Sequence, residues 1–335
     1  MAPAAIIPSA IEVKRTQLEP TSNKRKIVCF SDFDGTIFMQ DTGHVLFDNF
    51  GCGSKRRQVL DEQIKTGERS FRDVSEEMWG SLNVPFDNGF EVMEQSLDID
   101  PDFRAFHAFC LENSIPFNVI SAGLKPVLRK VLDTFLGEEQ SSHIQIVAND
   151  AAITQDGSDW KVIWRHDTEL GHDKALSVQE ARAAAEAELA DEDGVIPLVV
   201  FIGDGVSDLP AARQADVLFA RRGLRLEEYC QENDISCVPF DTFAGIQAEL
   251  AKIIEEDQRK TAGKGLPARF NPRANMWRRV SSKSAIPKLV LMSPTKEERM
   301  FLWPEAFTEL KTPALDVTRE LGVVGEEQAI AVPAA

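Results

Sequence analysis

Short, nearly continuous apolar runs alternate along the chain with longer stretches in which apolar residues recur every three or four positions. The short runs are typical of strands buried on both faces of a parallel sheet, and the longer stretches of the amphipathic helices that cover it. The runs that fit strands are KIVCF, IPFNVISAG, HIQIVAND, IPLVVFIGDG, VLFA and SCVPF, and AAITQDGSDWKVIW fits a hairpin turning at Asp156 and Gly157. The pattern predicts an α/β fold, a Rossmann-like doubly wound parallel sheet.

Helical spacing dominates between about residues 41 and 100, for example in SKRRQVLDEQIKTG and SFRDVSEEMWGSL. Because this stretch interrupts the alternation, we expect a helical cap domain at residues 41–100, inserted after the first strand of a core domain made of residues 26–40 and 101–256. Residues 1–25 lack periodicity and are predicted to form a flexible N-terminal tail.

The alternation stops near residue 258, and the charge then changes sign along the chain. Between Lys264 and Lys296 there are eight Lys or Arg and no Asp or Glu. Residues 257–335 are therefore predicted to form a basic and then acidic C-terminal extension, partly disordered. The extension could be a solvated tail or a segment that docks on the acidic domain or on a partner, and the sequence leaves both open.

Composition excludes several classes of function. A formal net charge of −17 argues against a nucleic-acid-binding surface, because phosphate backbones are bound by clustered Lys and Arg. No apolar stretch approaches the roughly 18 residues of a membrane-spanning helix, and the N-terminal MAPAAIIPSA does not resemble a signal peptide. The five cysteines contain no C-x-x-C pair, which favours a reducing, cytoplasmic compartment over disulfides or a zinc site.

Polar side chains follow four of the expected strands. They are Asp32 and Asp34 after KIVCF, Ser121 after NVI, Asn149 and Asp150 after IQIVA, and Asp204 after VVFIG, with Asp208 four residues further on in GDGVSDLP. In an open parallel sheet the ligand crevice lies past the carboxyl ends of the strands. These carboxylates would repel one another without a cation, and oxygen ligands of this kind suit Mg²⁺. Lys174, in GHDKA, is the expected positive side chain, and a bound phosphate would complete the charge balance.

Two other interpretations apply to Asp32 and Asp34 taken alone. Asp is common where a strand gives way to a turn, so the pair could be a structural cap. A calcium loop also begins D-x-D, but its sixth and twelfth positions would be Ile37 and Gly43, where Gly and Glu are required.

Four motifs together resemble those of the haloacid dehalogenase superfamily over about residues 26 to 256: SDFDGTI, the Ser of VISAG, the Lys of GHDK, and GDGVSD. The closer likeness is to the phosphoserine-phosphatase-like branch, which carries a helical cap after the first motif. Longer segments, including QDTGHVLFDNFGCGSKRR, VANDAAI and WRHDTELGHDKA, are similar to fungal phosphatases that act on sugar alcohol phosphates and related monophosphates.

The resemblance implies a phosphatase that works through a covalent aspartyl phosphate. Asp32 would be the nucleophile, and Asp34 would protonate the leaving alcohol and then activate water. Ser121 and the backbone at Ala122 and Gly123 would hold the phosphate oxygens, and Lys174 would offset negative charge. The implied Mg²⁺ site consists of Asp32, the backbone carbonyl of Asp34, Asp204 and Asp208.

The resemblance also points to three cap residues near the substrate. Asp41 lies where phosphoserine phosphatases place an acidic residue that meets the substrate amine, although it could equally be the N-cap of the first cap helix. Phe71 and Arg72, in SFRD, could face the substrate or only pack the cap. His172, beside the motif lysine, is expected to be structural.

The leading function is therefore Mg²⁺-dependent hydrolysis of a small-molecule phosphate monoester. One alternative is a phosphatase for a hydrophobic terpenoid or prenyl monophosphate, because the motifs report only the phosphate end. A phosphotransferase or mutase would use the same intermediate. A non-catalytic regulatory protein on the same fold is the alternative from another class. The leaving group, the oligomeric state and the role of residues 257–335 stay open.

Overall fold

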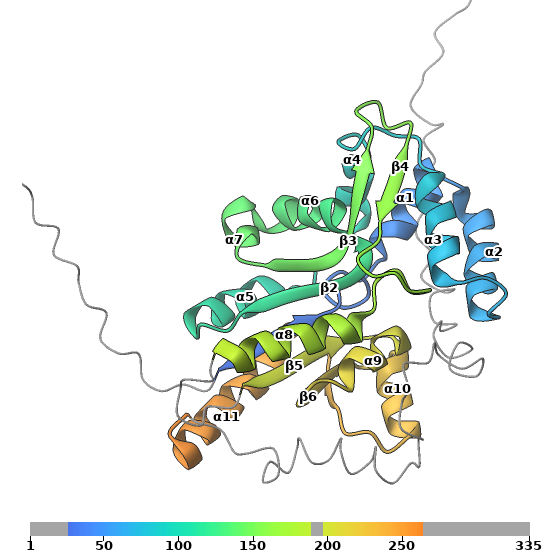
Figure 1. Cartoon of the computed structure of the whole chain (residues 1–335). Helices are drawn as coiled ribbons and strands as arrows, with labels where there is room; N and C mark the ends of the chain where they lie inside the picture. Colours follow the sequence, from blue (N-terminus) through green and yellow to red (C-terminus); the bar gives the residue numbers. More distant parts are fainter. Residues whose placement is uncertain (1–25, 189–196, 264–335) are drawn as a thin grey trace, which may run out of the picture. The chain divides into compact units, whose positions relative to one another are not determined.

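The computed structural model describes residues 26–188 and 197–263 (Figure 1). The predicted N-terminal tail, and the predicted C-terminal extension from residue 264 onward, lie outside the described residues. Among the residues described, no helix is both long and apolar enough to span a membrane.

A sheet with the strand order β4-β3-β2-β1-β5-β6-β7 forms the centre of the fold. Its strands are β1 (Ile27–Ser31), β2 (Phe117–Leu124), β3 (Gln145–Ile153), β4 (Trp160–Ile163), β5 (Leu198–Gly203), β6 (Val217–Arg221) and β7 (Val238–Phe240). All neighbours pair in parallel except β3 and β4, which form the predicted antiparallel hairpin. Strand β1 lies between β2 and β5, and β5 is buried along its whole length, as expected for a strand covered on both faces.

Helices cover both faces, so the predicted doubly wound α/β fold is confirmed. Helices α5 (Phe103–Glu112), α6 (Lys125–Leu136) and α11 (Phe243–Thr261) share one apolar cluster with the sheet. Helices α8 (Lys174–Glu188), α9 (Leu209–Ala212) and α10 (Arg225–Glu232) share a second cluster. Cys29 and Phe30, adjacent in β1, belong to different clusters because successive strand side chains point to opposite faces. The short elements α7 (Glu138–Ser142) and η1 (Val206–Asp208) complete the core.

Four helices follow β1 within the predicted cap: α1 (Thr42–Phe50), α2 (Gly53–Lys65), α3 (Phe71–Gly80) and α4 (Phe90–Ser96). The β3–β4 hairpin packs against them. Trp79 of α3 stacks on Trp160 of β4 with ring centroids 6.3 Å apart, and the Trp160 indole N–H donates to the Val84 carbonyl at 3.0 Å. The helices agree with the expected helical content, and the division into cap and core domains stays a prediction.

Ser121, Asn149 and Asp150 lie within strands, as the predicted strand runs IPFNVISAG and HIQIVAND required. Pairing with β4 continues β3 past Asn149 and Asp150 to Ile153. Ser121 lies inside β2, at a point where the β2–β3 register is interrupted between Ile120 and Leu124.

The predicted start of the C-terminal extension at residue 257 lies within α11, and the division into domains stays a prediction. Asp257 is buried, and an ion pair between Lys260 and Glu256 joins successive turns beyond that boundary. The helix ends only at Thr261, where Ala262 adopts a left-handed conformation.

Candidate active site

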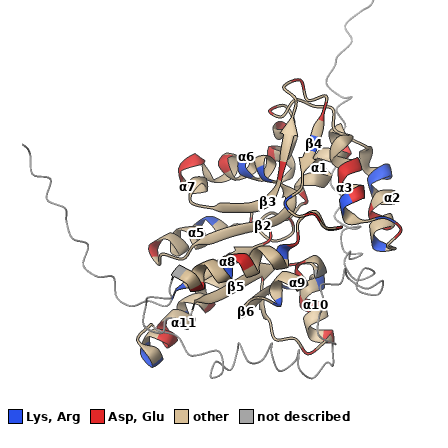
Figure 2. Cartoon of the chain, in the orientation of Figure 1, with Lys and Arg blue, Asp and Glu red and all other residues tan. Residues whose placement is uncertain are grey.

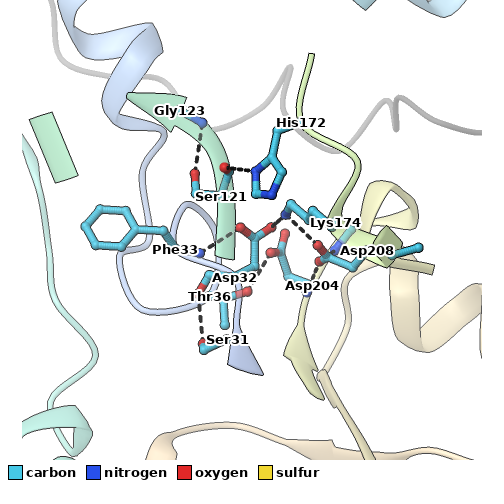
Figure 3. Close-up of polar contacts among 12 residues, drawn as sticks. Ser31, Asp32, Phe33, Thr36, Ser121, Gly123, His172, Lys174, Asp204 and Asp208 are labelled. Atoms are coloured by element: carbon cyan, nitrogen blue, oxygen red, sulfur yellow. Dashed lines mark hydrogen bonds and ion pairs between the residues drawn. The ribbon is translucent and has the colours of Figure 1, made fainter. Parts of the chain in front are cut away.

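Carboxylates from two adjacent strands converge at the carboxyl edge of the sheet (Figure 3). Asp32 follows β1, and Asp204 and Asp208 follow β5. One oxygen from each lies within 4.8 Å of the others, and all three side chains are buried. Carboxylates far apart in the sequence therefore meet, as expected from the topology of a parallel sheet.

The turn after β1 explains the D-x-D-G-T pattern. Gly35 has a φ of 77°, and a Cβ at this position would overlap the Asp204 carboxylate, so only glycine fits without strain. The Thr36 hydroxyl donates to Asp204 Oδ1 at 2.7 Å and thereby joins the turn to β5. Phe33 is fully buried between Asp32 and Asp34 and anchors the turn in the core.

Lys174, the first residue of α8, supplies a positive charge between two carboxylates (Figure 3). Its Nζ lies 2.7 Å from Asp32 Oδ2 and 2.8 Å from Asp208 Oδ1. Burial alone would lower the pKa of Lys174, but the charges of Asp208 and Asp32 outweigh it and raise the pKa. The lysine is therefore charged at neutral pH and holds Asp32 in place.

One lysine does not balance three buried carboxylates. Burial, and then repulsion by Asp208, raises the pKa of Asp204 to about 7. The same two causes, in the same order, raise the pKa of Asp32 well above its usual range. Oxygen ligands that lie this close and resist ionisation are stabilised by a hard divalent cation, so the residues present fit a Mg²⁺ site.

Asp34 occupies a different environment from Asp32. Its Oδ1 accepts a hydrogen bond of 2.8 Å from the backbone N–H of Thr42, the first residue of α1. Burial, and then the charge of Asp41, raises the pKa of Asp34 well above its usual range. A carboxyl group that retains its proton beside a lysine-paired carboxylate is suited to general acid catalysis.

Residues 121–123, the SAG turn, lie in the part of β2 where the register with β3 is interrupted, and each of them takes part in a hydrogen bond. Ser121 Oγ accepts from the Gly123 N–H at 3.0 Å, and the Ser121 carbonyl oxygen lies 2.6 Å from His172 Nδ1 (Figure 3). The Ala122 carbonyl accepts from Asn149 Nδ2 at 2.8 Å. The predicted phosphate-binding residues are therefore connected to β3 and to the segment before α8.

The expected cap residues have partners within the protein. Asp41 is the N-cap of α1 and accepts from the His44 N–H at 2.8 Å, which agrees with the interpretation of Asp41 as a helix cap. The charge of Asp41 also raises the pKa of Asp34. Arg72 pairs with Asp167 at 2.7 Å, and its guanidinium lies 5.5 Å from the centre of the Trp164 ring. Phe71 packs against the main apolar cluster. Substrate roles for Asp41, Phe71 and Arg72 stay predictions.

Several residues at the site were not identified from the sequence. Thr36 stands within the D-x-D-G-T motif, but no role was expected for its hydroxyl. Arg165 and Ser177 contact each other at 3.1 Å, and only the closeness of Ser177 to GHDK in the sequence marks either of them. Asn149 was expected at a strand end, whereas its amide supports the turn from within β3. A search for polar residues flanking GHDK would have found Ser177.

The fold is a doubly wound α/β sheet, and a buried cluster of three aspartates lies at its carboxyl edge. Residues 29–213 match the model of the haloacid dehalogenase-like hydrolase family. The chain belongs to this family, and the resemblance inferred from the four motifs is confirmed.

Curated relatives extend the match beyond the family level. The chain is 38% identical over 232 residues to Pdp3-interacting factor 1 of Schizosaccharomyces pombe, covering 69% of this chain and 98% of the relative. It is 36% identical over 231 residues to the polyol phosphate phosphatase PYP1 of Saccharomyces cerevisiae, covering 68% of this chain and 94% of the relative. The predicted enzyme class, a phosphatase, is confirmed by the family and by relatives that carry that name.

A solved structure supports the fold. A probable phosphoserine phosphatase from Vibrio cholerae aligns with a TM-score of 0.54 at 16% identity, covering 71% of this chain and 68% of that one. At this identity the likeness concerns the fold alone.

Proposed function

We propose that this protein hydrolyses a small-molecule phosphate monoester through a phosphorylated aspartate at Asp32, with Mg²⁺ as its cofactor. One observation carries the proposal. The Asp32 carboxylate is fixed by Lys174 at 2.7 Å beside two further buried carboxylates, while Asp34, two residues away, lies in surroundings that favour its protonated form. The pKa of both carboxyl groups is raised, and their partners distinguish them: Lys174 contacts Asp32, whereas Asp34 accepts from the Thr42 N–H. This difference suits Asp32 to be the nucleophile and Asp34 to be the acid.

In the first step an oxygen of Asp32 forms a bond to phosphorus as the ester P–O bond breaks. Asp34 gives its proton to the leaving alcohol. In the second step Asp34 takes a proton from water, whose oxygen attacks the same phosphorus. The bond to Asp32 breaks, inorganic phosphate leaves, and both aspartates return to their starting states. Lys174 and the N–H groups of the SAG turn would stabilise charge on the transferring group.

Four groups would hold Mg²⁺: the carboxylates of Asp32, Asp204 and Asp208 and the backbone carbonyl of Asp34. The ion would neutralise charge on the nucleophile and on the phosphoryl oxygens. The Thr36 hydroxyl holds Asp204 at 2.7 Å, so this chain orients one of the ligands in advance.

The proposed substrate is the phosphate of a small hydroxylated compound. The relative at 36% identity is named for polyol phosphates. Relatives at 28% identity, including one from Bacillus mycoides, are named for 2-hydroxy-3-keto-5-methylthiopentenyl-1-phosphate, another hydroxylated phosphate ester. A cytoplasmic location stays a prediction.

The test combines a substrate panel with trapping of the intermediate. Glycerol phosphate, other polyol phosphates, phosphoserine and a prenyl monophosphate are supplied with Mg²⁺, and released phosphate is measured. Acid quenching with radiolabelled substrate should trap phosphate on Asp32, as located by mass spectrometry. The Asp32→Asn variant should fold and trap no label. Full activity in that variant would reject the mechanism, and preference for the prenyl compound would reject the substrate class.

A further inference from the structure

A second group of polar residues contacts the backbone carbonyls of the SAG turn. His172 is its centre and is only 3% exposed. Its Nδ1 lies 2.6 Å from the carbonyl oxygen of Ser121, and its Nε2 lies 3.0 Å from Oγ of Ser177 in α8. The ring therefore connects the SAG turn directly to the helix that begins with Lys174.

The contacts assign the tautomer of His172. A carbonyl oxygen can only accept, so Nδ1 carries the proton and donates to Ser121. Nε2 then accepts from the hydroxyl of Ser177. Burial lowers the pKa of His172 to about 3, so the ring is neutral and keeps one acceptor nitrogen. A neutral ring without solvent access is suited to holding its neighbours rather than to moving protons.

Arg165 extends this connection in two directions. Its side chain Nε donates to Ser177 Oγ at 3.1 Å, the same hydroxyl that contacts His172. Its backbone N–H donates to Asn149 Oδ1 at 3.0 Å, and Asn149 Nδ2 donates in turn to the carbonyl of Ala122 at 2.8 Å. Two chains of hydrogen bonds thus lead from Arg165 to the consecutive carbonyls of Ser121 and Ala122.

Fixing two consecutive carbonyls also fixes the N–H groups that follow them. A trans peptide unit is planar, and its C=O and N–H point in opposite directions. Holding the carbonyls of Ser121 and Ala122 from behind therefore directs the N–H groups of Ala122 and Gly123 away from His172 and Asn149. The Gly123 N–H meets Ser121 Oγ at 3.0 Å, which agrees with this orientation.

We propose that His172 and Asn149 are positioning residues, which hold the N–H groups of the SAG turn toward the phosphate of the substrate. The inference rests on the proposed phosphatase function and deepens it. His172 acts through Ser121 and α8, so it also sets the spacing between the SAG turn and Lys174. Because the turn meets only the phosphate, the effect of these residues should be the same for every phosphate ester.

Binding of inorganic phosphate tests the inference without turnover. Isothermal titration calorimetry with the full chain and excess Mg²⁺ gives the Kd for phosphate, and thermal unfolding gives a temperature at which every variant is folded. His172→Ala should weaken phosphate binding about tenfold, the equivalent of one buried hydrogen bond. His172→Asn should stay within about threefold of wild type, because its amide nitrogen lies near the position of Nδ1.

Two further variants distinguish loss of positioning of the SAG turn from a general loss of stability. His172→Gln places its amide nearer to Nε2, so it should lose the Ser121 contact and bind phosphate as weakly as His172→Ala. His107→Ala is the matched control, because His107 is also a buried histidine, on α5, whose pKa burial lowers to about 4. This variant should lose stability and keep its phosphate affinity.

The outcomes decide between the inference and its premise. Unchanged affinity in folded His172→Ala, or equal weakening in His107→Ala, would overturn the positioning role. If His172→Ala does not fold, Ser177→Ala breaks the same connection with a smaller change and should weaken binding by a factor of about three; no change there would also overturn the role. Wild-type protein that binds no phosphate would reject the proposed function itself and, with it, the inference.

Discussion

The charged side chains of the crevice, meaning the candidate active site around Asp32, Asp204 and Asp208, and those of the predicted cap are paired in different ways. In the crevice, Lys174 contacts Asp32 and Asp208, and both partners lie on other elements far away in the sequence. In the cap, Arg57 pairs with Asp61 on the same helix, at 2.9 Å. Figure 2 shows charges of both signs intermixed on α2 and α3. The crevice charges depend on the assembled sheet, whereas many cap charges are satisfied within one or two helices.

This difference in pairing indicates which charged side chains take part in catalysis. Buried charges of like sign raise each other's energy, and such an arrangement persists where function requires it. Paired charges on partly exposed helices contribute little and need no functional explanation. Removing a crevice residue should therefore change catalysis or metal binding strongly, and removing a cap residue should change substrate preference weakly.

The largest effect in this comparison is expected for Asp34→Asn. An amide cannot protonate a leaving alcohol, so kcat for glycerol phosphate should fall by roughly 10²- to 10⁴-fold. Para-nitrophenol leaves without a proton, so the first turnover on its phosphate should be affected far less. Stopped-flow measurement should show a burst of nitrophenolate followed by slow turnover, because the second step still lacks its base.

The control for this prediction is Asp41→Asn, which changes the neighbouring cap carboxylate. Its effect should be small and similar for both substrates. Equal loss of the burst and of glycerol phosphate turnover in Asp34→Asn would show that Asp34 is not the acid.

The next largest effect is the pH dependence of the stability that Asp204 contributes. Its pKa is raised to about 7 in the folded protein, from about 3.9 in an unfolded chain. The folded state therefore binds more protons between these values, and the stability contributed by this group is lost as pH rises from about 4 to about 7. With a chelator at pH 8, Asp204→Asn should melt several degrees above wild type, and the difference should vanish below about pH 4.

With Mg²⁺ in place of the chelator, wild type should melt above Asp204→Asn. The ion should raise the melting temperature of wild type and leave that of Asp204→Asn unchanged. Asp150→Asn removes an exposed carboxylate and should follow wild type in both buffers. A variant less stable than wild type at every pH without metal would contradict the expected repulsion.

A smaller difference in stability is expected between alanine substitutions at two glycines that have similar backbone conformations. Gly35, in the crevice, and Gly67, beyond α2, have φ values of 77° and 69°. A Cβ at Gly35 would overlap Asp204, whereas nothing lies within 4 Å of one at Gly67. Gly67→Ala should cost about 1 kcal/mol, from the backbone alone, and Gly35→Ala about 1–3 kcal/mol more, from the overlap. Equal losses in urea unfolding would mean that the crevice can relax.

The fold was predictable because each element carries its own signal. The buried strands are apolar runs, and Gly137 ends α6 as a cap signal indicates. The runs IPFNVISAG and HIQIVAND likewise predicted β2 and β3. The interruption of the β2–β3 register between Ile120 and Leu124 was not predictable, because strand pairing is formed only in the assembled sheet.

The site was predictable as far as its residues lie in short motifs. Asp32, Asp204 and Lys174 meet because parallel topology brings strand ends together. The bond from Asn149 to the SAG turn and the bond from Arg165 to Asn149 join positions that are far apart in the sequence, and no local pattern marks these pairings. The partner of Arg72 was likewise hidden, because Asp167 approaches it only after the segment beyond β4 has folded against α3.

The smallest expected effect tests the contact between Arg72 and Asp167 and whether Arg72 sets substrate preference. The Arg72 side chain pairs with Asp167, which is almost fully exposed. The backbone N–H of Arg72 donates to the Glu169 carbonyl at 2.9 Å. If the side chain only joins α3 to this segment, Arg72→Ala and Asp167→Ala should each raise KM less than about fivefold, equally for phosphoserine and glycerol phosphate. If Arg72 instead leaves Asp167 to bind a substrate carboxylate, Arg72→Ala should impair phosphoserine alone, by more than about tenfold, while Asp167→Ala improves it. Because phosphoserine carries a carboxylate and glycerol phosphate does not, the ratio of their KM changes assigns the role of Arg72 independently of any effect on folding.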